Sequence, residues 1–118
     1  MNYPEQIEDV ALQLSQRTRE VQDLREQVTL RESAATLEVL NARDEQGRAL
    51  YSNETARNAA IKLALSSNNN YQELERRLTA AETERSQLLA RIERLRGEFR
   101  LHLLDRQQEI AAMGAEPA

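Results

Sequence analysis

Few residues in this 118-residue chain could carry out chemistry. His102 is the single histidine, and the absence of cysteine excludes thiol nucleophiles, disulfides and thiolate metal sites. Acids are paired at Glu82 and Glu84, and again at Glu8 and Asp9, but such pairs are common on solvated helices. No glycine-rich phosphate loop or Glu-x-x-His pair accompanies them. The sequence therefore predicts a protein that is not an enzyme, with no cofactor, no metal site and no small-molecule substrate.

The composition is typical of long helices rather than of a compact globule. Charged residues make up 31% of the chain, aromatic residues 3%, and the mean hydropathy is −0.73. The N-terminal sequence lacks the basic start and apolar run of a secretion signal, and no stretch approaches the roughly 20 apolar residues of a membrane span. We therefore expect a cytoplasmic protein without a membrane partner.

A regular apolar stripe runs through the last third of the sequence. Asn70 is predicted to cap this helix with Glu73 in a capping box, and the helix is expected over residues 71–112, followed by a disordered tail at 113–118. His102 is interpreted as a packing residue between helices, with a pH-sensitive contact as the alternative. Positions three and four residues apart in alternation give the heptad pattern of a coiled coil: Tyr71, Leu74, Leu78, Ala81, Arg85, Leu88, Ile92, Leu95, Phe99 and His102.

The first third carries a similar stripe. Pro4 suits the first turn of a helix that is expected over residues 4–41. Arg17 and Arg31 lie within the stripe and are expected to extend their guanidinium groups to water or to a facing carboxylate. At 1.5 Å per residue, the two helices would have similar lengths of about 57 and about 64 Å. The apolar members of this stripe are Ile7, Val10, Leu14, Val21, Leu24, Val28 and Ala35.

The segment between the stripes is predicted to contain a turn, a short helix and a polar break. Asp44 to Gly47 is typical of a turn, and Ser52 or Asn53 can cap a short helix over residues 54–66. Because Gly47 and the asparagine tract oppose an unbroken helix, the chain is expected to fold back on itself. The sequence thus predicts a single all-α domain over residues 1–118, an antiparallel two-helix coiled-coil hairpin with a short helix in its connecting segment.

Association is also predicted, because two packed helices bury little apolar surface. We expect a homo-oligomer, either a dimer or a larger assembly, joined at the open end of the hairpin. Apolar residues beside the two stripes form the candidate interface: Leu12, Leu89, Leu101, Leu103, Leu104 and Ile110.

The hairpin tip is a second candidate site. Basic residues could contact single-stranded nucleic acid by charge, and Tyr51 by stacking, although Asp44, Glu45 and Glu54 oppose such binding. A purely structural interpretation has Asn53 capping the short helix, an arginine bonding to loop carbonyls and the tyrosine covering the tip. The candidate tip residues are Arg43, Arg48, Tyr51, Arg57 and Lys62.

The same segment carries a family resemblance. Residues 47–54, Gly-Arg-Ala-Leu-Tyr-Ser-Asn-Glu, are followed by Arg57 and later by Tyr71. This order resembles a set of small phage, prophage and bacterial helical coiled-coil proteins over residues 35–100, some of them similar to phage recombination accessory proteins. The resemblance matches Tyr51, Asn53 and Arg57 to the recurring positions.

Three functional classes follow. The favoured one is a non-enzymatic interaction or scaffold protein that self-associates or presents a helical face to a protein partner. The first alternative is a recombination accessory or mediator factor that binds single-stranded DNA. The second is a holdase chaperone resembling prefoldin, although the connecting segment lacks the alternating β-branched pattern of the prefoldin β-hairpins.

Overall fold

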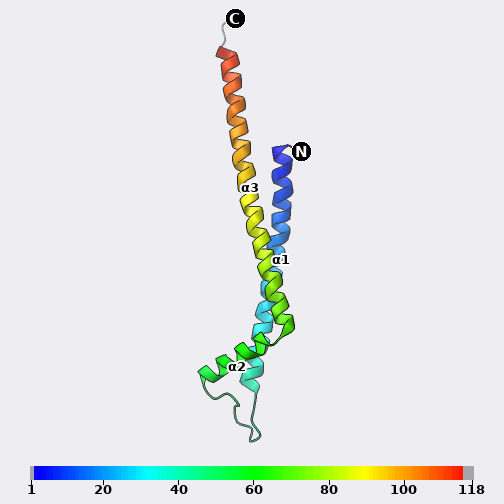
Figure 1. Ribbon diagram of the computed structural model, residues 1–118, viewed down its shortest axis with the longest axis vertical. Coiled ribbons are helices and arrows are strands. Elements are labelled where there is room, and N and C mark those ends of the chain that lie inside the picture. The colour runs from blue at the N-terminus through cyan, green and yellow to red at the C-terminus, as the bar shows by residue number, and fades with distance from the viewer. Residues whose placement is uncertain (1, 116–118) are drawn as a thin grey trace. The chain divides into compact units, whose positions relative to one another are not determined.

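The described part of the chain forms three helices. The computed structural model describes residues 2–115, in which α1 spans Tyr3–Asn41, α2 Glu54–Ser66 and α3 Asn69–Ala115, with no β-strand (Figure 1). The prediction of an all-α protein is confirmed. By their contacts the residues divide into two compact units. We call the residues up to Thr18 together with those from Thr83 onwards the terminal unit, and Arg19–Glu82 the central unit.

In the terminal unit, the first half of α1 packs against the second half of α3. Val10 is buried with Ile92 and Leu95. Nearer the start of α1, the Tyr3 ring lies 5.8 Å from the Phe99 ring, measured between centroids. The α3 partners thus move toward its C-terminus as α1 is followed toward its N-terminus, so these two segments run antiparallel. Half-buried side chains complete this core: Ile7, Ala11 and Leu88.

In the central unit, the rest of α1 packs against the start of α3. Val21 and Leu24 are buried with Leu74 and Ala81. The polar contacts show that the direction is again antiparallel, because Arg25 pairs with Glu82 whereas Glu32 pairs with Tyr71. Further buried or half-buried members of this unit are Val28, Ala35, Val39, Tyr71 and Leu78.

The predicted stripes account for nearly all of the buried apolar residues that the structure describes. Val39 is the exception. The heptad spacing after Ala35 points to Glu38, which is charged and remains exposed. Burial passes to Val39, four residues after Ala35, because a helix presents both i+3 and i+4 on the same face.

The connecting segment begins with the turn predicted at Asp44–Gly47. The Gly47 N–H donates to the Asp44 carbonyl oxygen at 3.0 Å, and the Asp44 carboxylate accepts hydrogen bonds from the Gln46 and Arg48 N–H groups at 2.9 Å each. Gly47 has φ +78°, a left-handed conformation in which a side chain would be strained. Beyond the turn, α2 runs at a steep angle to the adjoining ends of α1 and α3 within the central unit (Figure 1).

Asparagines cap the second and third helices. The Asn53 side chain accepts from the Ala56 N–H at 2.8 Å, as the sequence predicts. For α3, Asn68 accepts from the Tyr71 N–H at 3.0 Å, so the prediction of Asn70 as the cap is wrong. The consecutive asparagines are equivalent as capping residues. Because Ser67 is still in a helical conformation after α2, the next helix begins at once and the earliest asparagine becomes its cap.

The last helix continues further than the sequence predicts. Residues 113–115, which are expected to belong to a disordered tail, are helical, whereas residues 116–118 lie outside the described part of the chain. Gly114 is the reason why the sequence predicts an earlier end of this helix. A glycine within a helix costs only about 1 kcal/mol relative to alanine, and Gly114 does not adopt the left-handed conformation that ends many helices.

Candidate functional site

His102 lies in a small aromatic group of the terminal unit. Its ring centroid is 5.8 Å from that of Tyr3, which also contacts Phe99 at 5.8 Å. This arrangement agrees with a packing role for the exposed imidazole. Within residues 2–115, no group of three or more histidine, aspartate or glutamate side chains is placed to hold a metal ion.

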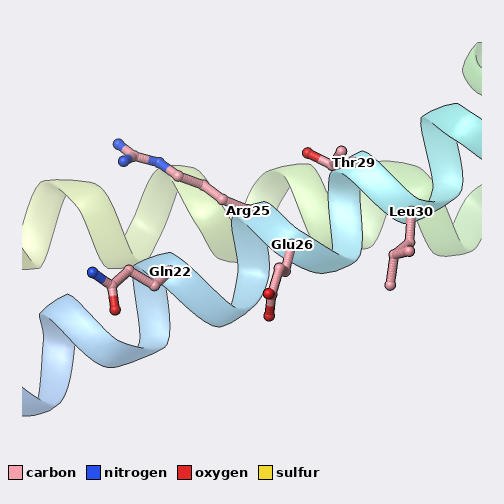
Figure 2. A pocket seen from close by; sticks show the side chains of 5 residues that line it. All are labelled: Gln22, Arg25, Glu26, Thr29 and Leu30. Carbon is pink, nitrogen blue, oxygen red and sulfur yellow. The ribbon is translucent and has the colours of Figure 1, made fainter.

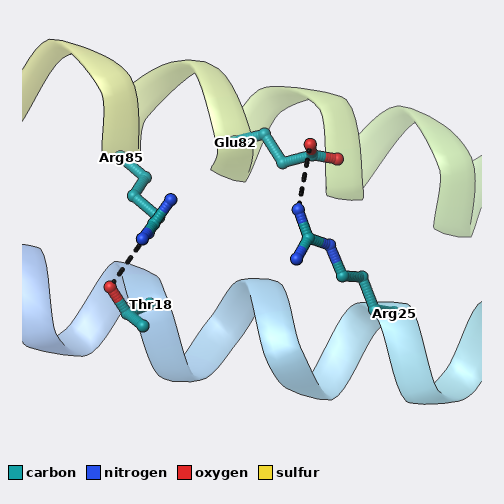
Figure 3. Close-up of polar contacts among 4 residues, drawn as sticks. All are labelled: Thr18, Arg25, Glu82 and Arg85. Carbon is teal, nitrogen blue, oxygen red and sulfur yellow. Dashed lines mark hydrogen bonds and ion pairs between the residues drawn. The ribbon is translucent and has the colours of Figure 1, made fainter.

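Glu82 and Glu84 take part in contacts between helices. In the terminal unit, a Glu84 carboxylate oxygen lies 2.5 Å from Arg17 Nε, so the arginine in the stripe reaches a facing carboxylate as predicted. In the central unit, Glu82 Oε2 lies 3.4 Å from Arg25 Nη2 (Figure 3). These two carboxylates therefore have structural partners on the facing helix.

Arg85, which lies in the stripe of α3, also forms a polar contact in the terminal unit. Arg85 Nε donates to the Thr18 hydroxyl oxygen at 3.1 Å, and this hydroxyl donates in turn to the Leu14 carbonyl oxygen at 2.9 Å (Figure 3). Both side chains are half-buried. The contact lets a charged residue occupy a stripe position because the guanidinium finds an acceptor on the facing helix.

Tyr71 has the most strongly altered ionisation among the described residues. It is buried, and its hydroxyl donates to Glu32 Oε2 at 2.9 Å. Burial raises the pKa of Tyr71 to about 12, and the hydrogen bond to the Glu32 carboxylate and the nearby charge of Glu75 act in the same direction. The phenol is therefore neutral at ordinary pH and joins α1 to α3.

The candidate tip residues do not form one site. Arg43 Nη1 donates to the carbonyl oxygens of Leu40 and Ala42, at 3.0 and 3.2 Å, so it satisfies the C-terminal end of α1. The sequence interpretation gives this role to Arg57, which is half-buried on α2. Arg48 lies in the turn, where its backbone N–H bonds to Asp44.

The other two candidates at the tip border different depressions. Tyr51 lies beside Val39 and Leu63, between α1 and α2. Lys62 lies beside Tyr71 and Glu75, at the start of α3. The structure thus places Tyr51 and Lys62 at different depressions and does not gather the predicted tip residues into the single site that the nucleic-acid prediction needs. Binding of single-stranded DNA stays a prediction.

The linker has little β structure. In residues 2–115, an isolated bridge between Arg43 and Ala49 is the only β pairing. A prefoldin-like linker would contain β-hairpins, so the feature that would favour a holdase is missing from the described connecting segment.

The predicted open-end residues lie on α1 and α3 in the terminal unit. Leu103 and Ile110 are 46% and 61% exposed, whereas Leu89 is half-buried. Met113, 70% exposed, belongs to the same surface but is not predicted, because the sequence interpretation ends the helix before it. Continuing the heptad spacing beyond His102 would have found it. The other exposed members are Leu12, Leu101 and Leu104.

A further apolar surface on α1 in the central unit is not predicted either. Leu30 and Leu37 are 68% and 59% exposed and lie seven residues apart. Leu30 also borders a shallow depression with Arg25, Glu26, Thr29 and Gln22, and in Figure 2 the Glu26 and Leu30 side chains project on the side where no other helix is drawn. The seven-residue spacing was the available signal. The sequence does not single it out, because the stronger stripe through Val28 and Ala35 already explains this helix.

Comparisons with known proteins give no relative: no family model, curated protein or solved structure matches this chain. None of the three helices, as far as their residues are described, has a stretch that could span a lipid bilayer.

Proposed function

We propose that this chain is a non-enzymatic interaction protein, in which α1 and α3 form one antiparallel coiled-coil hairpin that associates with copies of itself. Antiparallel packing of α1 on α3 within each unit supports the hairpin, and the hairpin would present its remaining apolar side chains to a partner. The phage-like resemblance is a separate prediction and carries no part of this proposal.

The exposed apolar surface at the end of α3 is the observation that carries the proposal. Leu103, Ile110 and Met113 are exposed on one side of this helix segment, because they lie three or seven residues apart, and the exposed Leu101 and Leu104 lie on its other side. Clustered exposed apolar residues on a protein surface mark contact sites, whereas scattered ones do not. Burying a leucine side chain in a contact with another protein stabilises that contact by about 1.5–3 kcal/mol.

The composition of the core gives a reason for self-association. Ala35 and Ala81 occupy buried positions, and an alanine side chain contributes little apolar burial. Helical proteins with so small a core gain stability when a second chain covers their apolar surface. A partner that binds the folded chain but not the unfolded chain shifts the equilibrium toward the folded state.

Light scattering on the purified chain tests the proposal. The expected mass exceeds the 13.5 kDa of one chain and rises with concentration. A Leu103→Ser, Ile110→Ser variant should associate at least about tenfold more weakly, since each lost leucine-sized contact is worth about 1.4 kcal/mol or more. Leu63→Ser is the matched control, because Leu63 is also exposed but lies on α2. A wild-type mass of one chain at every concentration would contradict self-association.

A further inference from the structure

The outward side of α1 in the central unit carries a second apolar stripe. Leu30 and Leu37 each follow a member of the core stripe, Val28 and Ala35, by two residues. At 3.6 residues per turn, two residues correspond to a rotation of about 200°, so the two leucines lie opposite the side that packs on α3. Ser33 and Ala34 lie between them and are exposed. We call Leu30, Ser33, Ala34 and Leu37 the α1 outer stripe.

The α1 outer stripe contains no charged residue, although 31% of the chain is charged. The two charges within this stretch of sequence are directed toward α3 instead. Glu32 accepts the hydrogen bond from Tyr71, and Arg31 borders a depression that α3 residues also line. A solvated helix face normally carries charges, so an uncharged one bearing two exposed leucines is suited to a contact with another apolar helix.

The order of side chains along the stripe is symmetrical. Read in either direction, it runs leucine, two residues, a small pair, two residues, leucine, with its centre between Ser33 and Ala34. A two-fold axis at this centre would place Leu30 of one copy beside Leu37 of the other. The small residues at the axis would let the helices approach closely, since the distance between packed helices depends on the side chains at the contact. A two-fold contact between identical chains requires this kind of self-complementary surface.

We propose that the α1 outer stripe pairs with the same stripe of a second copy, with the two α1 helices antiparallel. The inference rests on the proposed self-association and names a surface for it other than the end of α3. The pairing of Leu30 with Leu37 of the second copy also places Leu40 of the second copy opposite Gln27. This position is next to the depression bordered by Glu26 and Leu30 (Figure 2). Leu40 is exposed, so it is free to enter that depression.

Single-cysteine variants test the pairing, because the chain has no cysteine of its own. Ser33→Cys lies next to the proposed axis, where opposing Cα atoms can approach to the roughly 4.4–6.8 Å that a disulfide needs. We expect mild oxidation with diamide to convert it to a covalent dimer. Ser15→Cys, at another exposed serine on α1, is the control and should react far more slowly. Equal rates for the two variants would overturn the pairing.

Mixed oxidation tests the antiparallel direction. When Leu30→Cys is oxidised together with an equal amount of a size-tagged Leu37→Cys, the mixed dimer should clearly exceed the half share of all dimers that random pairing gives. A parallel pairing would instead join each cysteine to its own counterpart and would overturn the proposal.

A substitution in the stripe separates this inference from the proposed function. Leu30→Ser with Leu37→Ser should weaken self-association at least about tenfold relative to Leu63→Ser, whose side chain is equally exposed on α2. If this variant associates like the wild type while Leu103→Ser, Ile110→Ser does not, the α1 pairing is wrong and the proposed function stands. If the wild-type chain is a monomer at all concentrations, both are wrong.

Discussion

At the scale of single residues, Tyr71 makes a contact between α1 and α3 that depends on its protonation. A free tyrosine ionises near pH 10, whereas Tyr71 in the folded chain has a pKa of about 12. The raised value means that the fold favours the neutral phenol. The neutral Tyr71 phenol therefore contributes its full stabilisation of the folded chain below pH 10, and this stabilisation is lost as the pH rises through 12.

Replacing Tyr71 by phenylalanine tests this dependence. We expect Tyr71→Phe to be less stable by about 1–3 kcal/mol at neutral pH, because the hydrogen bond to a charged Glu32 is lost. The difference from wild type should shrink above pH 10, since only the wild-type chain loses stability when its tyrosine ionises. Urea unfolding followed by circular dichroism, with Tyr3→Phe as the control, measures both effects. A difference that stays constant across this pH range would contradict the contact.

The cap of α3 is also decided at single residues. Asn68→Ala should cost about 1 kcal/mol of stability, the usual value for losing an N-cap side chain, because the Asn68 side-chain Oδ1 accepts from the Tyr71 N–H. Asn70→Ala is the matched control and should change stability little. Thermal unfolding of both variants gives the comparison, and an equal or larger loss for Asn70→Ala would restore the capping role that the sequence predicts.

At the scale of the elements, two glycines should respond in opposite ways to alanine. Gly47 has φ +78° in the turn before α2, so Gly47→Ala is expected to destabilise the chain by about 1 kcal/mol. Gly97 lies within α3 and a Cβ there would meet nothing within 4 Å. Gly97→Ala should therefore stabilise the chain by about 0.5–1 kcal/mol. Chemical denaturation measures the change in the free energy of unfolding for both variants. Changes of the same sign would show that the backbone conformation given for one of the two glycines is incorrect.

The sequence indicates the elements well because each depends on local signals. Heptad spacing identifies the buried side of α1 and α3, Asn53 marks the start of α2, and Asp44 and Gly47 form a turn through their own backbone and side-chain bonds. The choice among neighbouring asparagines at the start of α3 is different. It depends on where α2 ends in space, which no local pattern encodes.

The candidate surfaces are only partly predictable for a related reason. Leu103 and Ile110 are recognisable in the sequence as apolar residues beside the stripe of α3, so the sequence predicts them as an interface. The opposite side of α1 offers only two leucines and two small residues, and such a short pattern is recognisable once the structure shows which side of the helix is already occupied. Arg43 illustrates the reverse case. Its charge indicates a tip contact, but the nearby end of α1 supplies carbonyl oxygens that take up its guanidinium.

At the scale of the whole molecule, two separate self-contact surfaces would have a consequence for assembly. One two-fold contact gives a dimer, whereas two different two-fold contacts on each copy join dimers into larger assemblies. The end of α3 and the α1 outer stripe would together produce assemblies larger than a dimer. Removing either surface should leave a dimer, which fits a scaffold that is built from one kind of chain.

In the proposed hairpin, α1 and α3 each continue without a break from one unit into the other. Distances between paired spin labels test it most directly, with labelled chains diluted in unlabelled protein. The label pairs Glu8→Cys with Glu26→Cys on α1, and Arg76→Cys with Arg94→Cys on α3, each span 18 residues across the boundary between the units. Straight helices predict narrow distributions near 27 Å in both, at about 1.5 Å per residue. Broad or clearly shorter distances would show that the helices break between the units and would contradict the hairpin.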